Sequence, residues 1–216
     1  MQLGYACINL SLSKSNKITT NRSMIKNTFL KKGISYAGEL ALLNCIDLIK
    51  ILEWNVENRI GFFRISSDIF PWASHYNIID LPQYQEIKNT LKVAGNIAKK
   101  NSLRLTAHPG PFNVLVSPNP SVVENTIKDL QIHGEIFDLL GLSFSPYNKI
   151  NIHCNGVYGD KKTAMDRFCY NYQKLPDTVK ARLTVENDDK SSMYSVQDLM
   201  YINNKIGIPI VFDYHH

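Results

Sequence analysis

Short apolar segments alternate with segments of helical periodicity along the whole sequence, and this order constrains the fold most. The apolar segments are rich in β-branched and aromatic residues and do not alternate polar with apolar positions, which is typical of strands buried on both faces. They cover residues 3–8, 60–65, 103–107, 149–153, 183–185 and 209–212. Helical spacing of apolar residues covers residues 40–52, 84–99, 121–140, 163–173 and 195–204. The alternation predicts an α/β fold with a parallel sheet and right-handed crossovers.

Two architectures satisfy this order, an open doubly wound sheet and a (β/α) barrel. No GxGxxG pattern follows the first predicted strand, so a dinucleotide site has no support. The choice between the two architectures therefore depends on where the polar residues fall.

Four consecutive predicted strands end in residues that can bind a metal. His108 follows the third strand, His153 ends the fourth, Glu186 follows the fifth and Asp213 follows the sixth. In a (β/α) barrel the carboxyl ends of the strands converge on one face, which is where active sites form. The pattern therefore predicts a TIM-type (β/α) barrel with a functional site at that face.

Imidazole and carboxylate ligands suit Zn²⁺, Mn²⁺ or iron, whereas carboxylates alone suit Mg²⁺. A glutamate placed between histidine-bearing strands and an aspartate-bearing strand could bridge two ions. Two ions roughly 3.5–4 Å apart stabilise the attacking and leaving oxygens of a phosphoryl displacement. A single-metal sugar-phosphate isomerase or epimerase uses the same residue types on the same fold, and it stays open as the alternative.

Composition sets broad limits on the class of protein. A chain of 216 residues with 44% hydrophobic residues predicts one domain over residues 1–216. The formal net charge of +5 mildly favours a polyanionic partner. The sequence contains no apolar run of membrane-spanning length and no signal-peptide pattern, so we expect an intracellular protein without a membrane partner. Its four cysteines form no CxxC pair, which argues against a zinc-thiolate site.

Seven short sequence motifs narrow the choice of protein family. They are GYACIN at 4–9, FRISSD at 63–68, PWASH at 71–75, AHPG at 107–110, NIHCNGVYGDK at 151–161, RLTVEND at 182–188 and FDYHH at 212–216. In this order they resemble the UV-damage endonuclease family, which is related to the endonuclease IV class of abasic-site nucleases. The resemblance extends over essentially the whole chain.

The resemblance implies a DNA repair endonuclease that cuts damaged double-stranded DNA. It implies a metal-dependent incision of the phosphodiester 5′ to UV photoproducts or abasic sites. The expected cofactors are up to three divalent ions, Mn²⁺ first, with Zn²⁺ or Mg²⁺ as alternatives. The expected protein is a monomer that acts wherever the DNA is, in the cytoplasm or the nucleus.

The resemblance also assigns metal ligands. It implies that His108 and His153 hold one ion and that Glu186, the central catalytic ligand, bridges this ion to a second. It places Asp213 on the second ion and His216 on the third.

Residues that contact DNA are assigned in the same way. Tyr5, Asn9 and His75 match family positions near the scissile phosphate or the damaged nucleotides, and Tyr5 and His75 are expected to be catalytic. Relatives typically follow the third-strand His-Pro with a glutamine and an aromatic residue that probe the damaged bases. Here Pro111 replaces the glutamine and Phe112 keeps the aromatic part, so both are expected to face DNA.

Length sets the last expectation. A (β/α)8 barrel typically needs about 250 residues, and only six strands are predicted here. We therefore expect a barrel truncated after its sixth strand, without its last two βα units and inactive by itself. If 216 residues were the natural length, a non-catalytic DNA-binding remnant would become the alternative.

Overall fold

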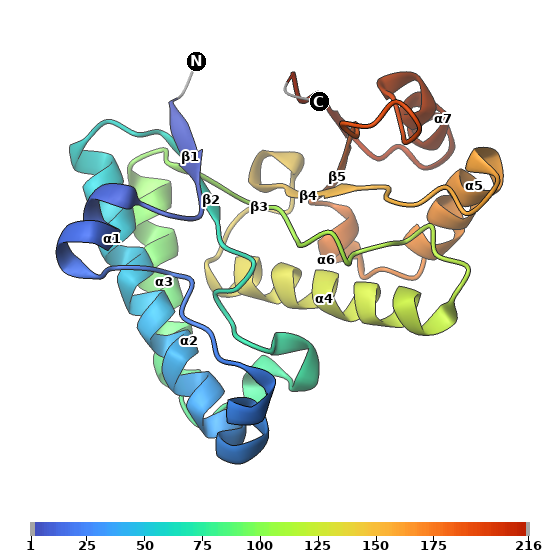
Figure 1. The fold of residues 1–216 in the computed structure, drawn as a ribbon. Helices are drawn as coiled ribbons and strands as arrows, with labels where there is room; N and C mark the ends of the chain where they lie inside the picture. The colour runs from blue at the N-terminus through green and yellow to red at the C-terminus, as the bar shows by residue number, and fades with distance from the viewer. Residues whose placement is uncertain (1–2, 215–216) are drawn as a thin grey trace. The chain divides into compact units, whose positions relative to one another are not determined.

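Strands and helices alternate along the chain as the sequence predicts, in the computed structural model of the protein, which describes residues 3–214. The chain divides into two structural units, drawn in Figure 1. The first contains the residues up to Ala107 together with Glu135–Ser143. The second contains His108–Gly134 and the residues from Phe144 onward.

Three parallel strands form the centre of the first unit. They are β1 (Gly4–Ala6), β2 (Phe62–Ile65) and β3 (Arg104–Ala107). β2 pairs with both neighbours, and Phe63 lies opposite Tyr5 on one side and Leu105 on the other. All three predicted strands are confirmed, although the first is shorter than expected.

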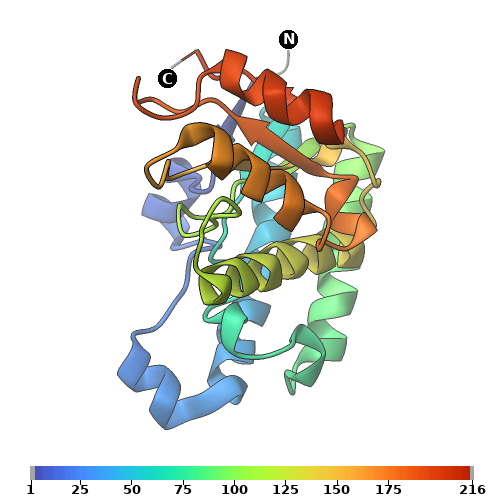
Figure 2. The same ribbon diagram turned by 90° about the vertical axis from the view of Figure 1, so that its right-hand side faces the viewer.

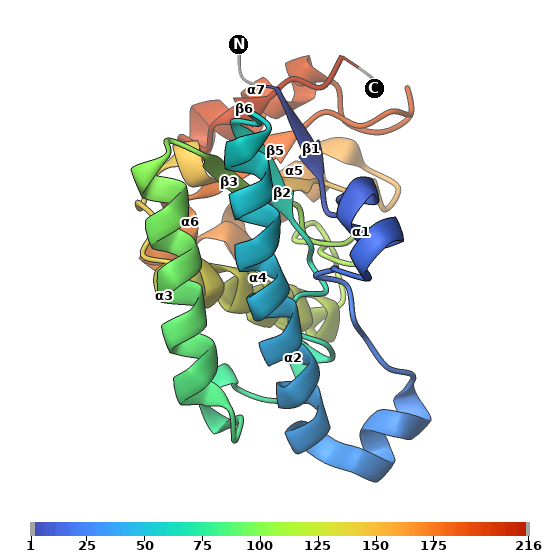
Figure 3. The same cartoon turned by 90° about the vertical axis from the view of Figure 1, so that its left-hand side faces the viewer.

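Two long helices, α2 (Lys26–Glu57) and α3 (Tyr84–Lys100), run side by side in the first unit, as Figure 3 shows. The residues of α3 at the predicted helical spacing are all buried, namely Ile87, Leu91, Ala94 and Ala98. The remaining buried position of α3 is Gly95, where a Cβ atom would lie 1.7 Å from the backbone oxygen of Leu140. A side chain at position 95 would therefore push the two segments apart.

The chain before α2 differs most from prediction. The expected helix over 40–52 begins at Lys26 instead, and Gly33 interrupts it with non-helical angles (φ 65°, ψ −161°). An unpredicted helix, α1 (Leu10–Asn16), starts where the Asn9 side chain accepts a hydrogen bond from the backbone N–H of Leu12. Both differences have one reason, since these segments expose most of their residues and lack an apolar stripe.

Three parallel strands also form the centre of the second unit. They are β4 (Ile150–His153), β5 (Leu183–Glu186) and β6 (Ile210–Val211). Its helices, seen from the side in Figure 2, are α4 (Pro120–Leu139, of which 120–134 belong to this unit), α5 (Lys161–Tyr172), α6 (Asp177–Lys180) and α7 (Val196–Ile206). Short 3₁₀ helices complete the chain as η1 (Ala73–His75), η2 (Ile78–Asp80) and η3 (Pro146–Asn148).

Helices α4 and α7 begin in different ways. Ser195 caps α7 in a complete capping box with Asp198. Ser121 does not cap α4, because Pro120 is already the first helical residue and the Asn119 side chain accepts from the backbone N–H of Ser121. Proline suits the first helical position because its missing N–H would have no partner there.

Burial on both faces holds for β3, β4 and β5 and fails for β2, where only the alternate residues Phe63 and Ile65 are buried. Every residue of β5 is buried, and three of the four in β4 are. β1 and β6 each contain no buried residue, so the expectation of burial on both faces is wrong for the first and last strands. Within residues 3–214 no helix is both long and apolar enough to cross a membrane.

The buried carboxylate of Asp47 holds the segment that precedes α2. Asp47 is 4% exposed and accepts hydrogen bonds from the side chains of Arg22 (2.5 Å) and Lys50 (2.8 Å) and from the backbone of Thr19 (3.1 Å). Burial raises the pKa of the Asp47 carboxyl, but these three donors outweigh burial and hold the pKa below its usual value. The network joins the segment before α2 to the body of the helix.

Asp47→Asn is expected to lower the free energy of unfolding of the complete protein by about 1–3 kcal/mol at neutral pH, because three hydrogen-bond donors lose a charged, buried acceptor. Since the folded-state pKa is depressed, the stabilisation is present above the unfolded pKa of about 3.9 and is lost as the pH falls through the folded value. Urea unfolding at pH 7 and below pH 4 measures this. The exposed Glu53→Gln on the same helix should have almost no effect. Equal losses at both pH values would contradict the charge argument.

Candidate metal centre

Two histidines and a glutamate of the second unit converge at the carboxyl ends of strands. His153 is the last residue of β4 and Glu186 the last of β5, and the parallel register places them directly opposite each other. His108 comes directly after the last residue of β3 in the sequence. Three of the predicted metal ligands therefore lie together.

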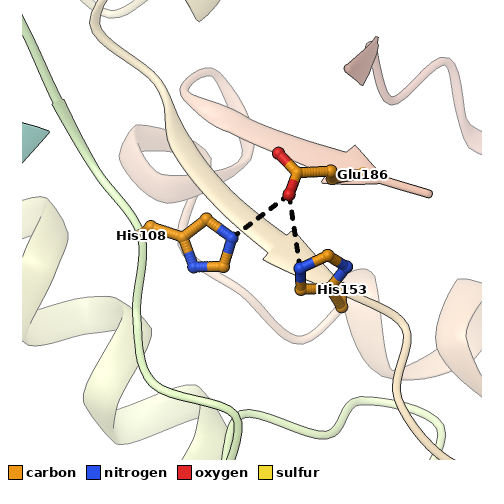
Figure 4. Close-up of side chains that lie close together, drawn as sticks. All are labelled: His108, His153 and Glu186. Carbon is orange, nitrogen blue, oxygen red and sulfur yellow. Dashed lines mark ion pairs between the residues drawn. The ribbon is translucent and has the colours of Figure 1, made fainter. Parts of the chain in front are cut away.

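The distances fit a shared ion. His108 Nε2 lies 3.5 Å and His153 Nε2 lies 3.3 Å from the same carboxylate oxygen, Glu186 Oε1, as Figure 4 shows. One donor atom from each residue lies within 4.8 Å of the other two. The imidazole side chains are 20% and 17% exposed, and Glu186 is buried. The site is thus partly desolvated but open enough to be reached.

The outward nitrogens of both imidazoles face acceptors. His108 Nδ1 lies 3.2 Å from the backbone oxygen of Pro109, and His153 Nδ1 lies 3.5 Å from Asp188 Oδ1. A proton on each Nδ1 leaves the Nε2 lone pairs directed at Glu186. Three electron-pair donors that face one another need a shared cation, which is either a proton on an imidazole or a metal ion. The donor set therefore fits a divalent metal.

Electrostatics keep the Glu186 carboxyl ionised. Burial raises the pKa of this carboxyl. When the imidazoles are protonated and no metal is bound, the hydrogen bond from His108, the charges of His108 and His153 and the hydrogen bond from Asn151 together exceed that effect, so the pKa of the Glu186 carboxyl lies below its usual value. A carboxylate that is charged at neutral pH is the form that binds a metal.

A second layer of polar residues holds Glu186 in place. Asn151 donates from Nδ2 to Glu186 Oε2, and Thr184 donates from its hydroxyl to Asn151 Oδ1 at 2.6 Å. Asn151 and Thr184 lie opposite each other one pleat before His153 and Glu186, so all four side chains share one face of the strands. Neither residue is assigned a role by the sequence patterns. Their signal was a polar residue two positions before a ligand inside an apolar strand.

Asp188 has a comparable role behind His153. Its backbone N–H donates to the Tyr194 backbone oxygen at 3.0 Å, and the Tyr194 N–H lies 3.3 Å from Asp188 Oδ2. The Tyr194 hydroxyl donates to the backbone oxygen of Gly156 at 2.9 Å. This loop therefore fixes the Asp188 carboxylate beside the imidazole. Carboxylates in this position set the tautomer and the orientation of metal-binding histidines.

A cavity of about 310 Å³ adjoins the two histidines. It is lined by His108, Pro109, Gly110, Pro111, Asn113, Ile152, His153 and Asn155. Phe112 lies in the same loop and is 87% exposed. Pro111 therefore borders the metal donors, and Phe112 presents an aromatic ring to solvent. Their predicted contact with DNA stays a prediction.

Asp213, a fourth predicted ligand, is not part of this cluster. Asp213 follows β6, and its backbone N–H and carbonyl are held by the side chain of Asn187, the neighbour of Glu186. Within residues 3–214 the cluster of candidate donors contains His108, His153 and Glu186 without the Asp213 carboxylate. His216 lies outside the described residues. The roles of Asp213 and His216 stay predictions.

Two predicted DNA-contacting residues of the first unit are joined by hydrogen bonds. Asn9 Nδ2 donates to the Tyr5 hydroxyl at 2.8 Å, and this hydroxyl donates to Asn55 Oδ1 at 2.7 Å. Burial raises the pKa of the Tyr5 phenol, against the lowering effect of both hydrogen bonds. The hydroxyl therefore stays protonated at neutral pH. Asn55 was not predicted, because it lies 50 residues away on a helix.

His75 lies in a cluster of aromatic rings in the first unit. Its ring is 5.6 Å from that of Phe29 and 5.0 Å from that of Trp72, both edge-on. The side chain is exposed, with Nδ1 at 3.1 Å from the Ser74 hydroxyl. Its predicted catalytic role stays a prediction.

Comparison with known proteins gives one family. A model for UV-endonuclease UvdE matches residues 1–216. The chain is 38% identical over 216 residues to a UV DNA damage endonuclease of Clostridium perfringens and 40% identical over 219 residues to a UV-damage endonuclease of Schizosaccharomyces pombe. Both matches cover 100% of this chain, which spans 50% of the first protein and 36% of the second. A putative UV-damage endonuclease of Acanthamoeba polyphaga mimivirus is 36% identical over 217 residues, and this chain spans 65% of its length.

Solved structures agree on the fold. The crystal structure of SacUVDE matches this chain with a TM-score of 0.89 and 33% identity. The match covers 100% of this chain and 70% of the SacUVDE chain. This likeness confirms the predicted α/β fold of the TIM-type (β/α) barrel class. A D-psicose 3-epimerase from Clostridium cellulolyticum H10 matches with a TM-score of 0.55 at 13% identity, which shows the fold alone.

Proposed function

The chain belongs to the UV-endonuclease UvdE family, and on that premise we propose that the complete protein is a metal-dependent DNA repair endonuclease. The observation that carries the metal dependence is the convergence of His108, His153 and Glu186 within 4.8 Å. Both imidazole Nε2 atoms lie close to the same oxygen of Glu186, and a divalent ion would be held between these three atoms.

The residues of the site set its charge and its order. Two neutral imidazoles and one carboxylate would leave a bound divalent ion with one net positive charge. A divalent ion supplies charge that stabilises the oxygens of a phosphodiester during displacement. Asn151 and Asp188 keep Glu186 and His153 in place while the phosphodiester approaches. The protein thus contributes a fixed, partly dry site that favours an anionic substrate.

The finer assignments are part of the same proposal. We propose Mn²⁺ as the metal, incision 5′ to UV photoproducts or abasic sites, and further ions held by Asp213 and His216. Tyr5, Asn9 and His75 are proposed to lie near the scissile phosphate or the damaged nucleotides. The protonated Tyr5 hydroxyl would then turn its single proton from Asn55 Oδ1 to a phosphate oxygen.

The activity is proposed for the complete protein. The chain spans about half the length, or less, of the first two curated relatives. The donors that the structure brings together are enough for one ion. We therefore expect residues 1–216 alone to bind one metal ion and to show little incision.

The test is incision of a labelled duplex by the complete protein. A UV-irradiated duplex incubated with Mn²⁺ should be nicked immediately 5′ of the photoproduct, and a ligase should reseal the nick because a 3′-hydroxyl and a 5′-phosphate remain. Excess chelator should abolish nicking, and an unirradiated duplex serves as the control. Nicking that survives complete metal removal would contradict the proposal.

Phe112→Ala is expected to reduce discrimination between damaged and undamaged duplex by roughly 10-fold, because base stacking on an aromatic ring contributes about 1–3 kcal/mol. The ratio of the two dissociation constants measures this. Tyr170→Ala removes another exposed aromatic side chain from the same unit, on α5, and should leave the ratio unchanged. An unchanged ratio in Phe112→Ala would remove Phe112 from lesion recognition.

A further inference from the structure

All of the net positive charge of the chain comes from its first 38 residues. This stretch contains six of the 24 basic residues and none of the 19 acidic residues. The other 178 residues contain 18 basic and 19 acidic residues, so their formal net charge is −1. The six basic residues are Lys14, Lys17, Arg22, Lys26, Lys31 and Lys32. Residues 14–32 are called the basic segment below.

The lysines of the basic segment are available to a partner. All five are exposed, and among residues 3–214 no acidic side chain forms an ion pair with any of them. Arg22 differs, because it is bound to the buried Asp47. The segment therefore has one structural cation and five exposed lysines, one of which, Lys32, lies with Nζ 3.9 Å from the centre of the Tyr36 ring.

The backbone of the basic segment is held in place within the first unit. Asn44 is buried and pairs with Arg22 in both directions, accepting from its N–H at 3.0 Å and donating to its carbonyl at 3.1 Å. Asp47 accepts from the backbone of Thr19. Because the backbone is fixed before a partner arrives, less conformational entropy is lost on binding.

The basic segment follows β1 in the sequence and contacts the connection that follows β2. It follows β1 through α1, and Figure 3 shows it running beside α2 before it turns into that helix. The Trp72 indole, in the connection after β2, donates to the Met24 carbonyl at 2.8 Å, and Phe29 stacks on Trp72 with ring centres 5.4 Å apart. The segment is thus joined to residues that follow the carboxyl end of β2, and active sites in this fold class form on the side of the carboxyl ends.

We propose that the basic segment is a docking surface for the sugar–phosphate backbone of duplex DNA. This rests on the proposed function and deepens it, since it assigns the sequence-independent part of DNA affinity to one segment. Lysines are compact point charges that neutralise phosphates without reading bases. A membrane surface fits less well, because the helical stretch before Gly33, residues 26–32, has only Phe29 and Leu30 as apolar side chains, and Phe29 is stacked on Trp72.

Salt dependence tests the proposal. Each phosphate that a lysine neutralises contributes about −0.9 to the slope of log affinity against log salt. The triple variant Lys26→Gln, Lys31→Gln, Lys32→Gln of the complete protein should lose about two to three units of this slope on undamaged duplex. Its affinity near 0.15 M salt should fall roughly 10- to 100-fold. Nicking at saturating protein should stay close to wild type.

The matched control removes the same charge from another face of the first unit. Lys88, Lys92 and Lys100 are exposed residues of α3, and their triple glutamine variant should change the slope by less than one unit. Equal slope changes in the two variants would overturn the proposal, because net charge alone would explain them. So would unchanged DNA affinity combined with loss of binding to phosphatidylserine vesicles. A wild-type protein that binds DNA but never nicks irradiated duplex would instead contradict the proposed function alone.

Discussion

Glu186→Gln is expected to lower both metal affinity and incision by the complete protein by more than about 100-fold, beyond the effect of losing an outer partner of a ligand. The amide keeps the size of the side chain but removes the negative charge that faces both imidazole nitrogens at 3.5 and 3.3 Å. It also places a possible N–H donor against the Asn151 amide donor. Calorimetric titration with Mn²⁺ and single-turnover incision measure the two effects.

Glu124→Gln is the control for that substitution. Glu124 is an exposed residue of α4 in the same unit. Its substitution makes the same chemical change away from the site. It should bind metal and cut like the wild type. Full metal occupancy in Glu186→Gln would mean that the cluster is not the metal site, and equal losses in both variants would point to folding instead.

Asp188→Asn is expected to weaken metal binding by about 10–100-fold, the usual effect of removing an outer partner of a ligand. The carboxylate lies 3.5 Å from His153 Nδ1, where it stabilises the Nδ1–H tautomer and makes Nε2 a better donor. Asparagine can keep the backbone contact with Tyr194 but not the charge. Metal titration and the ¹⁵N chemical shifts of the His153 ring measure affinity and tautomer separately.

Asp189→Asn tests whether the effect is specific to position 188. Asp189 is the next residue and is exposed, and its substitution changes the net charge by the same amount. It should leave both the metal affinity and the ring shifts unchanged. If Asp188→Asn lowered stability without any shift in the His153 ring nitrogens, Asp188 would be a structural residue rather than a positioning residue for the ligand.

The alternation of strands and helices was predictable because it depends on local patterns. Apolar runs such as 103–107 and 183–185 have few ways to be buried other than as inner strands, and α3 shows helical periodicity through its whole length. The same logic located the ligands. A parallel sheet brings the ends of its strands to one edge, so His153 and Glu186 could be expected as neighbours without coordinates.

Local patterns failed where contacts between distant residues decide the conformation. The path of the chain before α2 is set by Asp47 and Asn44, which bind the backbone at residues 19 and 22 from 22 to 28 positions away. No periodicity marks such a segment, because most of its side chains face solvent. The predicted burial of both faces failed at β1 and β6 for a related reason, since the sequence of a strand does not show its place among its neighbours.

The sequence by itself determined the fold class, the family motifs and the three candidate ligands, because strand period and chain order fix which side chains reach the common edge. Only the tertiary structure decided how those ligands are held. Asn151 reaches Glu186 across 35 positions, and Asp188 reaches His153 across an equal span. These contacts depend on the lateral register between strands and on the path of the loop after β5. Side-chain packing over the whole fold sets both, and no local pattern encodes it.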